Sequence, residues 1–182
     1  MMRESRARIN AAQTGILSVF DMHGFQKVIT PLLEYVEVLS LGMGDALKER
    51  VLKFIDPSSG RVVAIRPDIT PQIARMVATR MRDFPLPLKL CYNENVLRYQ
   101  EAQDGRSREV LQIGAEYITK GASAEADAEM IVMSIEALTR LGLKDFKIDI
   151  GDVGFLRSVL TKLDITEDER ALVKRALAIK DT

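Results

Sequence analysis

The chain has 182 residues, of which 47% are hydrophobic and 29% are charged, the balance of an ordinary globular protein with a sizeable core. Its 26 Lys and Arg residues equal its 26 Asp and Glu residues, so the formal net charge is zero. A dedicated nucleic-acid binder usually carries a basic excess or a basic stripe. The charge balance therefore counts against a large nucleic-acid-binding surface.

The cysteine and histidine counts limit the sites that the chain can build. Cys91 is the only cysteine and His23 the only histidine, which excludes an intrachain disulfide, a thiolate zinc cluster and a multi-histidine metal site. We expect His23, beside Gly24, to end a helix rather than act as a catalytic base. No window approaches ~18 consecutive apolar residues and the charged N-terminus lacks a signal-peptide pattern. We expect a cytoplasmic protein without membrane contact, metal or cofactor.

The first third of the chain predicts a helix followed by extended segments. Apolar residues at helical spacing indicate a helix over residues 4–22, and they are Ile9, Ile16, Val19 and Phe20. Residues 25–31 form an extended segment that Pro31 closes. Residues 32–50 stay ambiguous, because Gly42 and Gly44 interrupt an otherwise apolar stretch.

The next part predicts a hairpin and a second helix. Two apolar runs, 51–55 and 61–65, flank Asp56-Pro57-Ser58-Ser59-Gly60, whose proline and glycine favour a tight turn. Thr70 is then a candidate N-cap and Pro71 a candidate first helical residue. The buried stripe of this helix is predicted to be Ile73, Val77 and Met81, and Phe84-Pro85-Leu86-Pro87 ends it.

The remaining elements complete the expected fold class. Residues 88–99 and 108–118 read as two long strands around a polar loop. A helix over 123–142 follows, with Ile131, Ile135 and Leu138 predicted to face inward. Residues 146–150 alternate as a strand should, and two helices are expected at 153–163 and 167–179. Long hairpins mixed with helices predict an α+β fold, an antiparallel sheet flanked by helices.

Polar residues on the two long strands suggest a ligand pocket. Gln112 and Glu116 share a strand face because their separation is even, and Arg98 lies on the paired strand. Asp68, at the mouth of a helix, adds a second carboxylate. Two acids, an amide and a guanidinium suit a zwitterion, since acids accept from an ammonium and arginine donates to a carboxylate or phosphate. From the residues alone, solvated strand residues and ordinary ion pairs remain an equal alternative.

Three segments together resemble a known family: 24–34, 65–70 and 96–116. They resemble motif 1, the Arg-Pro-Glu-Gly-Thr-type element and motif 2 of histidyl-tRNA synthetase and its paralogue, over residues 3 to about 155. The resemblance implies a class II aminoacyl-tRNA synthetase catalytic-domain-like fold, with Phe25 and Pro31 at a dimer interface. It assigns histidine binding to Asp68, Thr70, Arg98, Gln112 and Glu116. It places Arg98, Arg106 and Arg108 at the loop that closes over ATP.

Departures from the synthetase pattern favour the paralogue. Gln100 stands where a synthetase has the motif 2 glutamate that contacts adenine, and Asp68-Ile69-Thr70 replaces Glu-Gly-Thr. Residues 98–109, 66–75 and 148–154 are more similar to the regulatory subunit of ATP phosphoribosyltransferase. This resemblance implies a non-catalytic, histidine-sensing subunit required for the first step of histidine biosynthesis. Its partners would be a short-form catalytic subunit and a second copy of itself, and not tRNA.

Two other hypotheses stay open from the sequence. The chain could be a histidyl-tRNA synthetase fragment, or a dimerisation module whose pocket is vestigial. In both related families the catalytic-like domain continues past the position of Thr182, through a histidine-specific loop and motif 3. We therefore expect one incomplete, C-terminally truncated domain over residues 1–182, with an insertion or helical subdomain from about residue 155.

Overall fold

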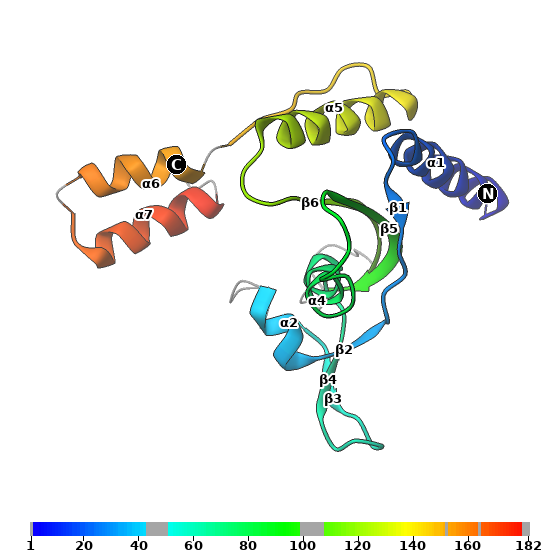
Figure 1. Cartoon of the computed structure of the whole chain (residues 1–182), viewed down its shortest axis with the longest axis horizontal. Coiled ribbons are helices and arrows are strands. Elements are labelled where there is room, and N and C mark those ends of the chain that lie inside the picture. Colours follow the sequence, from blue (N-terminus) through cyan, green and yellow to red (C-terminus); the bar gives the residue numbers. More distant parts are fainter. Residues whose placement is uncertain (1, 43–50, 99–107, 152, 164, 180–182) are drawn as a thin grey trace. The chain divides into compact units, whose positions relative to one another are not determined.

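The computed structural model describes residues 2–42, 51–98, 108–151, 153–163 and 165–179 (Figure 1). They divide into two compact units, Met1–Lys144 and Asp145–Thr182. The elements of the first unit are α1 (Met2–Met22), β1 (Gln26–Lys27), β2 (Leu33–Tyr35), α2 (Val36–Gly42), β3 (Lys53–Ile55), β4 (Val62–Ile65), α4 (Thr70–Arg80), β5 (Leu88–Leu97), β6 (Glu109–Ile118) and α5 (Ala124–Arg140). Those of the second are α6 (Val153–Lys162) and α7 (Glu167–Ile179). The expectation of a single domain over 1–182 stays a prediction.

The principal sheet has the strand order β1-β5-β6. β5 and β6 pair antiparallel along their whole length, from Leu88 opposite Ile118 to Leu97 opposite Glu109, which confirms the two predicted long strands. β1 pairs with β5 in parallel, so the sheet is not purely antiparallel as predicted. Gly24, at φ 78°, ends α1 and leads the chain directly into β1. The predicted helix stop at His23 and Gly24 is confirmed.

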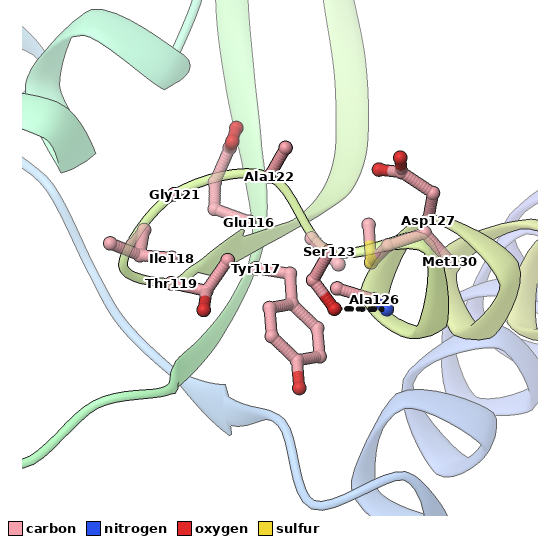
Figure 2. A pocket seen from close by; sticks show the side chains of 11 residues that line it. Glu116, Tyr117, Ile118, Thr119, Gly121, Ala122, Ser123, Ala126, Asp127 and Met130 are labelled. Atoms are coloured by element: carbon pink, nitrogen blue, oxygen red, sulfur yellow. Dashed lines mark hydrogen bonds between the residues drawn. The ribbon is translucent and has the colours of Figure 1, made fainter.

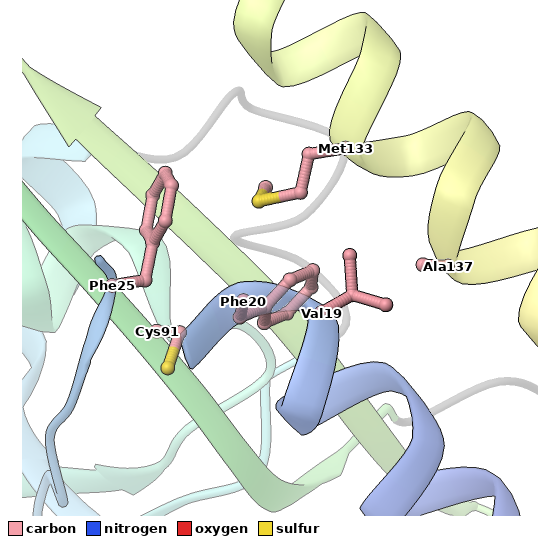
Figure 3. Close-up of a cluster of buried hydrophobic side chains, with 6 residues drawn as sticks. All are labelled: Val19, Phe20, Phe25, Cys91, Met133 and Ala137. Carbon is pink, nitrogen blue, oxygen red and sulfur yellow. The ribbon is translucent and has the colours of Figure 1, made fainter. Parts of the chain in front are cut away.

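The two faces of this sheet carry separate cores. Odd-numbered residues such as Cys91 face α1 and α5 and form a cluster with Val19, Phe20, Phe25, Met133 and Ala137 (Figure 3). Even-numbered residues face α4, where Leu90, Tyr92 and Val96 pack against Ile69 and Ile73. Each fully buried large apolar side chain stabilises the fold by about 1.5–3 kcal/mol. Because successive side chains of a strand point to opposite faces of the sheet, one face packs against α1 and α5 and the other packs against α4.

The α4 prediction is confirmed in its buried stripe and wrong in its cap. Ile73 is buried, and Val77 and Met81 pack at the edge of the same cluster. The N-cap is Ile69, without a side-chain capping bond, and Thr70 is the first helical residue. Thr70 lies one residue inside the helix rather than at the cap, and its hydroxyl donates to Glu116 Oε1 at 2.7 Å.

The α5 prediction is right in its extent and wrong in part of its inward face. Ser123 caps the helix by accepting from Ala126 N. The residues that meet the core are Met133 and Ala137, whereas the predicted Ile135 is 39% exposed. Two apolar stripes lie side by side on this helix, and the one with the small Ala137 lets α1 approach. Similarly, Ile9 of the predicted α1 stripe is 52% exposed.

The second sheet of this unit, in the order β2-β4-β3, contains the predicted hairpin. Asp56 organises its turn by accepting from Ser58 N and from the hydroxyls of Ser58 and Ser59, and Gly60 supplies a φ of 69°. The stretch that was ambiguous in the sequence contributes β2 and α2, and residues 43–50 lie outside the described residues.

The second unit confirms both predicted helices and corrects one strand. Thr166 and Glu169 form a capping box at the start of α7, with Thr166 N donating to Glu169 Oε2 at 2.8 Å and Glu169 N to Thr166 Oγ1 at 3.3 Å. Residues 146–150 form no strand, so that prediction is wrong. Ile150 is 74% exposed, and an alternating segment becomes a strand only when another strand accepts its backbone hydrogen bonds. No described helix is long and apolar enough to cross a membrane.

Candidate functional site

A buried arginine holds the segment that carries Asp68. Arg66 is 3% exposed. Its guanidinium donates to Asn95 O at 2.8 Å, to Thr30 O at 2.8 Å and to Glu94 Oε2 at 3.0 Å. Its backbone donates to Leu32 O and accepts from Leu97 N. These bonds fix the chain between β4 and α4 against β5, and Asp68 follows two residues later.

A second buried polar group ties α4 to the segment before β2. Gln72 is fully buried; its Nε2 donates to Pro31 O at 2.7 Å and its Oε1 accepts from Thr30 Oγ1 at 2.8 Å. One turn later, Arg75 donates to Glu34 Oε2 at 2.6 Å and 2.9 Å. A cavity of about 290 Å³ lies beside these groups. Sequence reasoning missed all of these partners, because each bond joins residues far apart in the chain.

The predicted pocket residues meet on the even face of β5 and β6. Gln112 Nε2 donates to Asp68 Oδ1 at 2.9 Å, and the same oxygen accepts from Ile69 N at 2.7 Å. Thr70 Oγ1 donates to Glu116 Oε1 at 2.7 Å. The strands therefore bring Asp68, Thr70, Gln112 and Glu116 together, although Glu116 is 46 residues from Thr70 in sequence and Gln112 is 44 from Asp68.

A tyrosine that the sequence did not single out completes this cluster. Tyr92 lies on β5 directly opposite Gly114, and its hydroxyl accepts from Gln112 Nε2 at 3.2 Å. A Cβ atom on Gly114 would stand 2.3 Å from the Tyr92 hydroxyl oxygen and 2.4 Å from Cζ, so the ring occupies the space that glycine leaves. The even spacing of 92, 112 and 116 across the predicted strand pair was the signal available in the sequence.

The structure describes two of the three arginines predicted for this site. Arg98 follows β5 on the same face, and its Nε donates to Pro67 O at 3.3 Å. Its backbone N donates to Arg108 O at 2.9 Å, which brings Arg108 to the end of the strand pair. Arg106 lies outside the described residues.

The cluster has an acidic character. Among the described residues, neither Asp68 nor Glu116 forms an ion pair. Burial raises the pKa of Glu116, the Thr70 hydroxyl lowers it in part, and the negative charge of Asp68 raises it further. Burial also raises the pKa of Tyr92. Gln112 Oε1 is buried, and it has no hydrogen-bond partner among the described residues. Unpaired carboxylates beside an unused amide oxygen favour binding of a cationic N–H donor.

A cavity adjoins this cluster at the end of β6. It has a volume of about 580 Å³ and lies between Glu116, the loop after β6 and the first turns of α5 (Figure 2). Tyr117, Thr119, Ser123, Asp127 and Met130 are among its lining residues. Its size is that of a small-molecule site.

Of the two residues predicted for a dimer interface, one is buried and the other is exposed. Phe25 is 3% exposed and packs inside the chain near Phe20 and Tyr117, so its side chain is not available to a second copy. Pro31 is exposed, and so are its neighbours Ile29, Leu32 and Leu33. Phe25, which immediately precedes β1, therefore belongs to the core cluster of this unit.

Comparison with known proteins identifies the family. The sequence model of histidyl-tRNA synthetase matches residues 1–182. The chain belongs to this family. It is 47% identical over 178 residues to an ATP phosphoribosyltransferase regulatory subunit of Geobacter sulfurreducens, a match that covers 98% of this chain and 40% of that protein. The chain thus spans about two fifths of the length of that relative.

Solved structures of the family agree with the fold. An ATP phosphoribosyltransferase regulatory subunit/histidyl-tRNA synthetase from Bacillus halodurans is 32% identical, with a TM-score of 0.89 over 98% of this chain and 45% of that one. A histidine–tRNA ligase subunit from Alicyclobacillus acidocaldarius is 31% identical, with a TM-score of 0.66 over 76% of this chain and 39% of that one. The predicted class II synthetase-like α+β fold is confirmed, as is the resemblance to the regulatory subunits.

Proposed function

We propose that the chain is the synthetase-like part of a regulatory subunit of ATP phosphoribosyltransferase, which senses histidine and has no chemistry of its own. Its similarity to regulatory subunits at 47% identity supports this function. The observation that carries it is the acidic cluster of Asp68 and Glu116 beside Gln112 Oε1, to which nothing in the described part of the chain donates. In this proposal the subunit acts in the first step of histidine biosynthesis and needs no cofactor.

The ligand is matched to the cluster by charge. A buried ammonium is costly to desolvate unless carboxylates accept its protons, and Asp68 and Glu116 provide two carboxylates. Each has an oxygen to which none of the described residues donates a hydrogen bond. Thr70 and Gln112 hold the other oxygens. We assign the α-ammonium to Asp68 and Gln112 and the imidazole to Glu116, which borders the cavity of about 580 Å³.

Arg98 supplies the opposite charge. Its Nε is held by Pro67 O at 3.3 Å, and within the described part of the chain its terminal nitrogens make no hydrogen bond. A planar guanidinium fixed at one nitrogen can still donate to a carboxylate through the others. We assign the ligand carboxylate to Arg98 and retain Arg106 and Arg108 as the phosphate-loop arginines of the family pattern.

The competing function is that of a histidine–tRNA ligase, which the Alicyclobacillus relative's name favours. Gln100 in place of the motif 2 glutamate argues against it. The decisive experiment expresses the full-length protein together with a short-form ATP phosphoribosyltransferase catalytic subunit. We expect the two to purify as a complex whose activity histidine changes. Histidine-dependent ATP–pyrophosphate exchange by the protein alone, without any effect on the transferase, would instead establish the ligase.

Self-association belongs to the same proposal. Ile29, Pro31, Leu32 and Leu33 form an exposed apolar surface beside the buried Thr30, and exposed apolar patches mark interaction sites. We propose that a second copy covers this surface. A vestigial dimerisation module would share the surface and lack the histidine affinity, so a histidine titration separates the two ideas.

A further inference from the structure

The hydroxyl of Tyr92 and the carboxylate of Asp68 together account for both donors of one amide. A glutamine side chain has two N–H donors on Nε2 and an acceptor at Oε1. Gln112 Nε2 lies 2.9 Å from Asp68 Oδ1 and 3.2 Å from the Tyr92 hydroxyl. Asp68 can only accept when ionised, so the amide nitrogen must face it. With both donors engaged, Oε1 is left as the acceptor of this amide; it is buried, and none of the described residues donates to it.

The position of the Tyr92 hydroxyl depends on the residue across the strand pair. Tyr92 is buried and its ring packs in the cluster of Ile69, Ile73 and Leu90. The ring crosses β6 at Gly114, where any Cβ would overlap Cζ and the hydroxyl oxygen. Gly114 has no positive φ to explain it. Its lack of a side chain is what allows the tyrosine hydroxyl to reach Gln112, two residues along β6.

We infer that Tyr92, seated on Gly114, is a positioning residue of the amino-acid site, which orients the Gln112 amide so that Oε1 accepts from the ligand's ammonium. This inference rests on the proposed function. The Tyr92 hydroxyl is hydrogen-bonded to Gln112 and also to Thr70, and the role inferred here is the one that it plays through Gln112. It therefore sets the preference for ligands that carry an α-ammonium.

The variant Tyr92→Phe tests this role because it keeps the ring in the core and removes only the hydroxyl. One N–H of Gln112 then loses its acceptor in a part-buried position, which is unfavourable. The amide is free to rotate away from the ligand, and we expect histidine affinity to fall about tenfold, a change of ~1.4 kcal/mol. Tyr35→Phe, on β2 of the other sheet, is the matched control and should leave affinity unchanged.

A double-mutant cycle separates positioning from packing. Calorimetric titration of histidine is carried out on the full-length protein and on Tyr92→Phe, Gln112→Leu and the double variant. If Tyr92 acts through Gln112, the loss caused by Tyr92→Phe should shrink to less than about twofold in the Gln112→Leu background. Imidazolepropionate, which lacks the ammonium, should bind Tyr92→Phe and the unsubstituted protein equally.

The possible outcomes are distinct. Equal histidine affinity in Tyr92→Phe and the unsubstituted protein overturns the inference while the proposed function stands. The same loss with and without Gln112 also overturns it, because the tyrosine would then act directly, through its other partner Thr70, or through packing. An unsubstituted protein that binds no histidine overturns the proposed function and this inference with it. Gly114→Ala offers a second route, since displacing the ring should reproduce the loss of affinity in a protein that still unfolds cooperatively.

Discussion

Replacing Arg66 by methionine should destabilise the fold more than the loss of any exposed charge. The guanidinium, which is 3% exposed, donates to the carbonyl and hydroxyl of Thr30, to Asn95 O and to Glu94 Oε2, all within 3.0 Å. Methionine fills a similar volume and donates nothing, so the buried carbonyl of Thr30, the part-buried carbonyl of Asn95 and the part-buried carboxylate of Glu94 lose a partner. Breaking a buried ion pair from one side typically costs ~3–5 kcal/mol, a large share of the ~5–15 kcal/mol that holds a domain together.

Urea unfolding of the full-length protein, followed by circular dichroism, measures this loss. Arg82→Met is the control, because Arg82 is exposed just after α4 and should change the free energy of unfolding by less than about 0.5 kcal/mol. We expect Arg66→Met to lower strongly the urea concentration at the unfolding midpoint, while the dependence of the unfolding free energy on urea concentration stays unchanged. A loss below about 1 kcal/mol would refute the reasoning, because it would mean that water or a neighbouring side chain satisfies the groups that Arg66 leaves.

The remaining predictions concern charge, pH and assembly. Hydrogen bonds from His23 to Glu136 at 2.8 Å and to Glu129 at 3.4 Å raise the pKa of His23. The added stability is thus present below the unfolded-state pKa of His23 and is lost as pH rises through its folded-state pKa. His23→Gln should therefore lower the free energy of unfolding by up to about 1 kcal/mol at pH 5.5 and by less at pH 8. Equal losses at the two pH values would contradict this prediction. Because burial raises the pKa of Glu116, a cationic ligand should displace its proton. Histidine affinity should then fall as pH drops through that pKa, and the binding enthalpy should depend on the buffer's ionisation enthalpy, a dependence that Glu116→Gln abolishes. Ile29, which is 77% exposed, should matter to self-association, and Ile29→Asp is expected to weaken the dimer at least about tenfold in sedimentation velocity. An unchanged dimer would place the interface elsewhere.

Local patterns in the sequence predicted the elements that depend on local chemistry. The two long strands predicted at 88–99 and 108–118 around a polar loop form the pair of β5 and β6, and Asp56 to Gly60 form the predicted hairpin turn, because residues close in sequence determine both. The pairing of those strands then placed Gln112 and Glu116 on one face. Asp68 and Thr70 joined them as the family resemblance implied, and their role in binding histidine stays a proposal.

Features that depend on distant partners were missed or wrongly predicted. Threonine is a common N-cap residue, yet the Thr70 hydroxyl donates to Glu116 on β6. Residues 146–150 alternate like a strand and form none, because a strand needs a neighbour. Nothing in the local sequence distinguishes Arg66, Gln72 and Tyr92 from other charged, polar and aromatic residues. Their partners, which include carbonyls for Arg66, the Thr30 hydroxyl for Gln72 and the Gln112 amide for Tyr92, come together only in the fold. The spacing of apolar residues in a sequence does not predict hydrogen-bond partners that are distant in the chain.

The central claim is that Glu116 and Asp68 bind a cationic amino acid, and one titration tests it most directly. Histidine is titrated calorimetrically into the full-length protein and into Glu116→Gln, which is nearly isosteric and keeps a partner for Thr70. Glu109→Gln, on the opposite face of the same strand, is the matched control. Loss of one partner of a buried charge pair typically costs ~2–5 kcal/mol, so the affinity of Glu116→Gln should fall by some tens- to thousands-fold while Glu109→Gln binds normally. Equal affinities for Glu116→Gln and the unsubstituted protein would contradict the account, because histidine would then be sensed elsewhere.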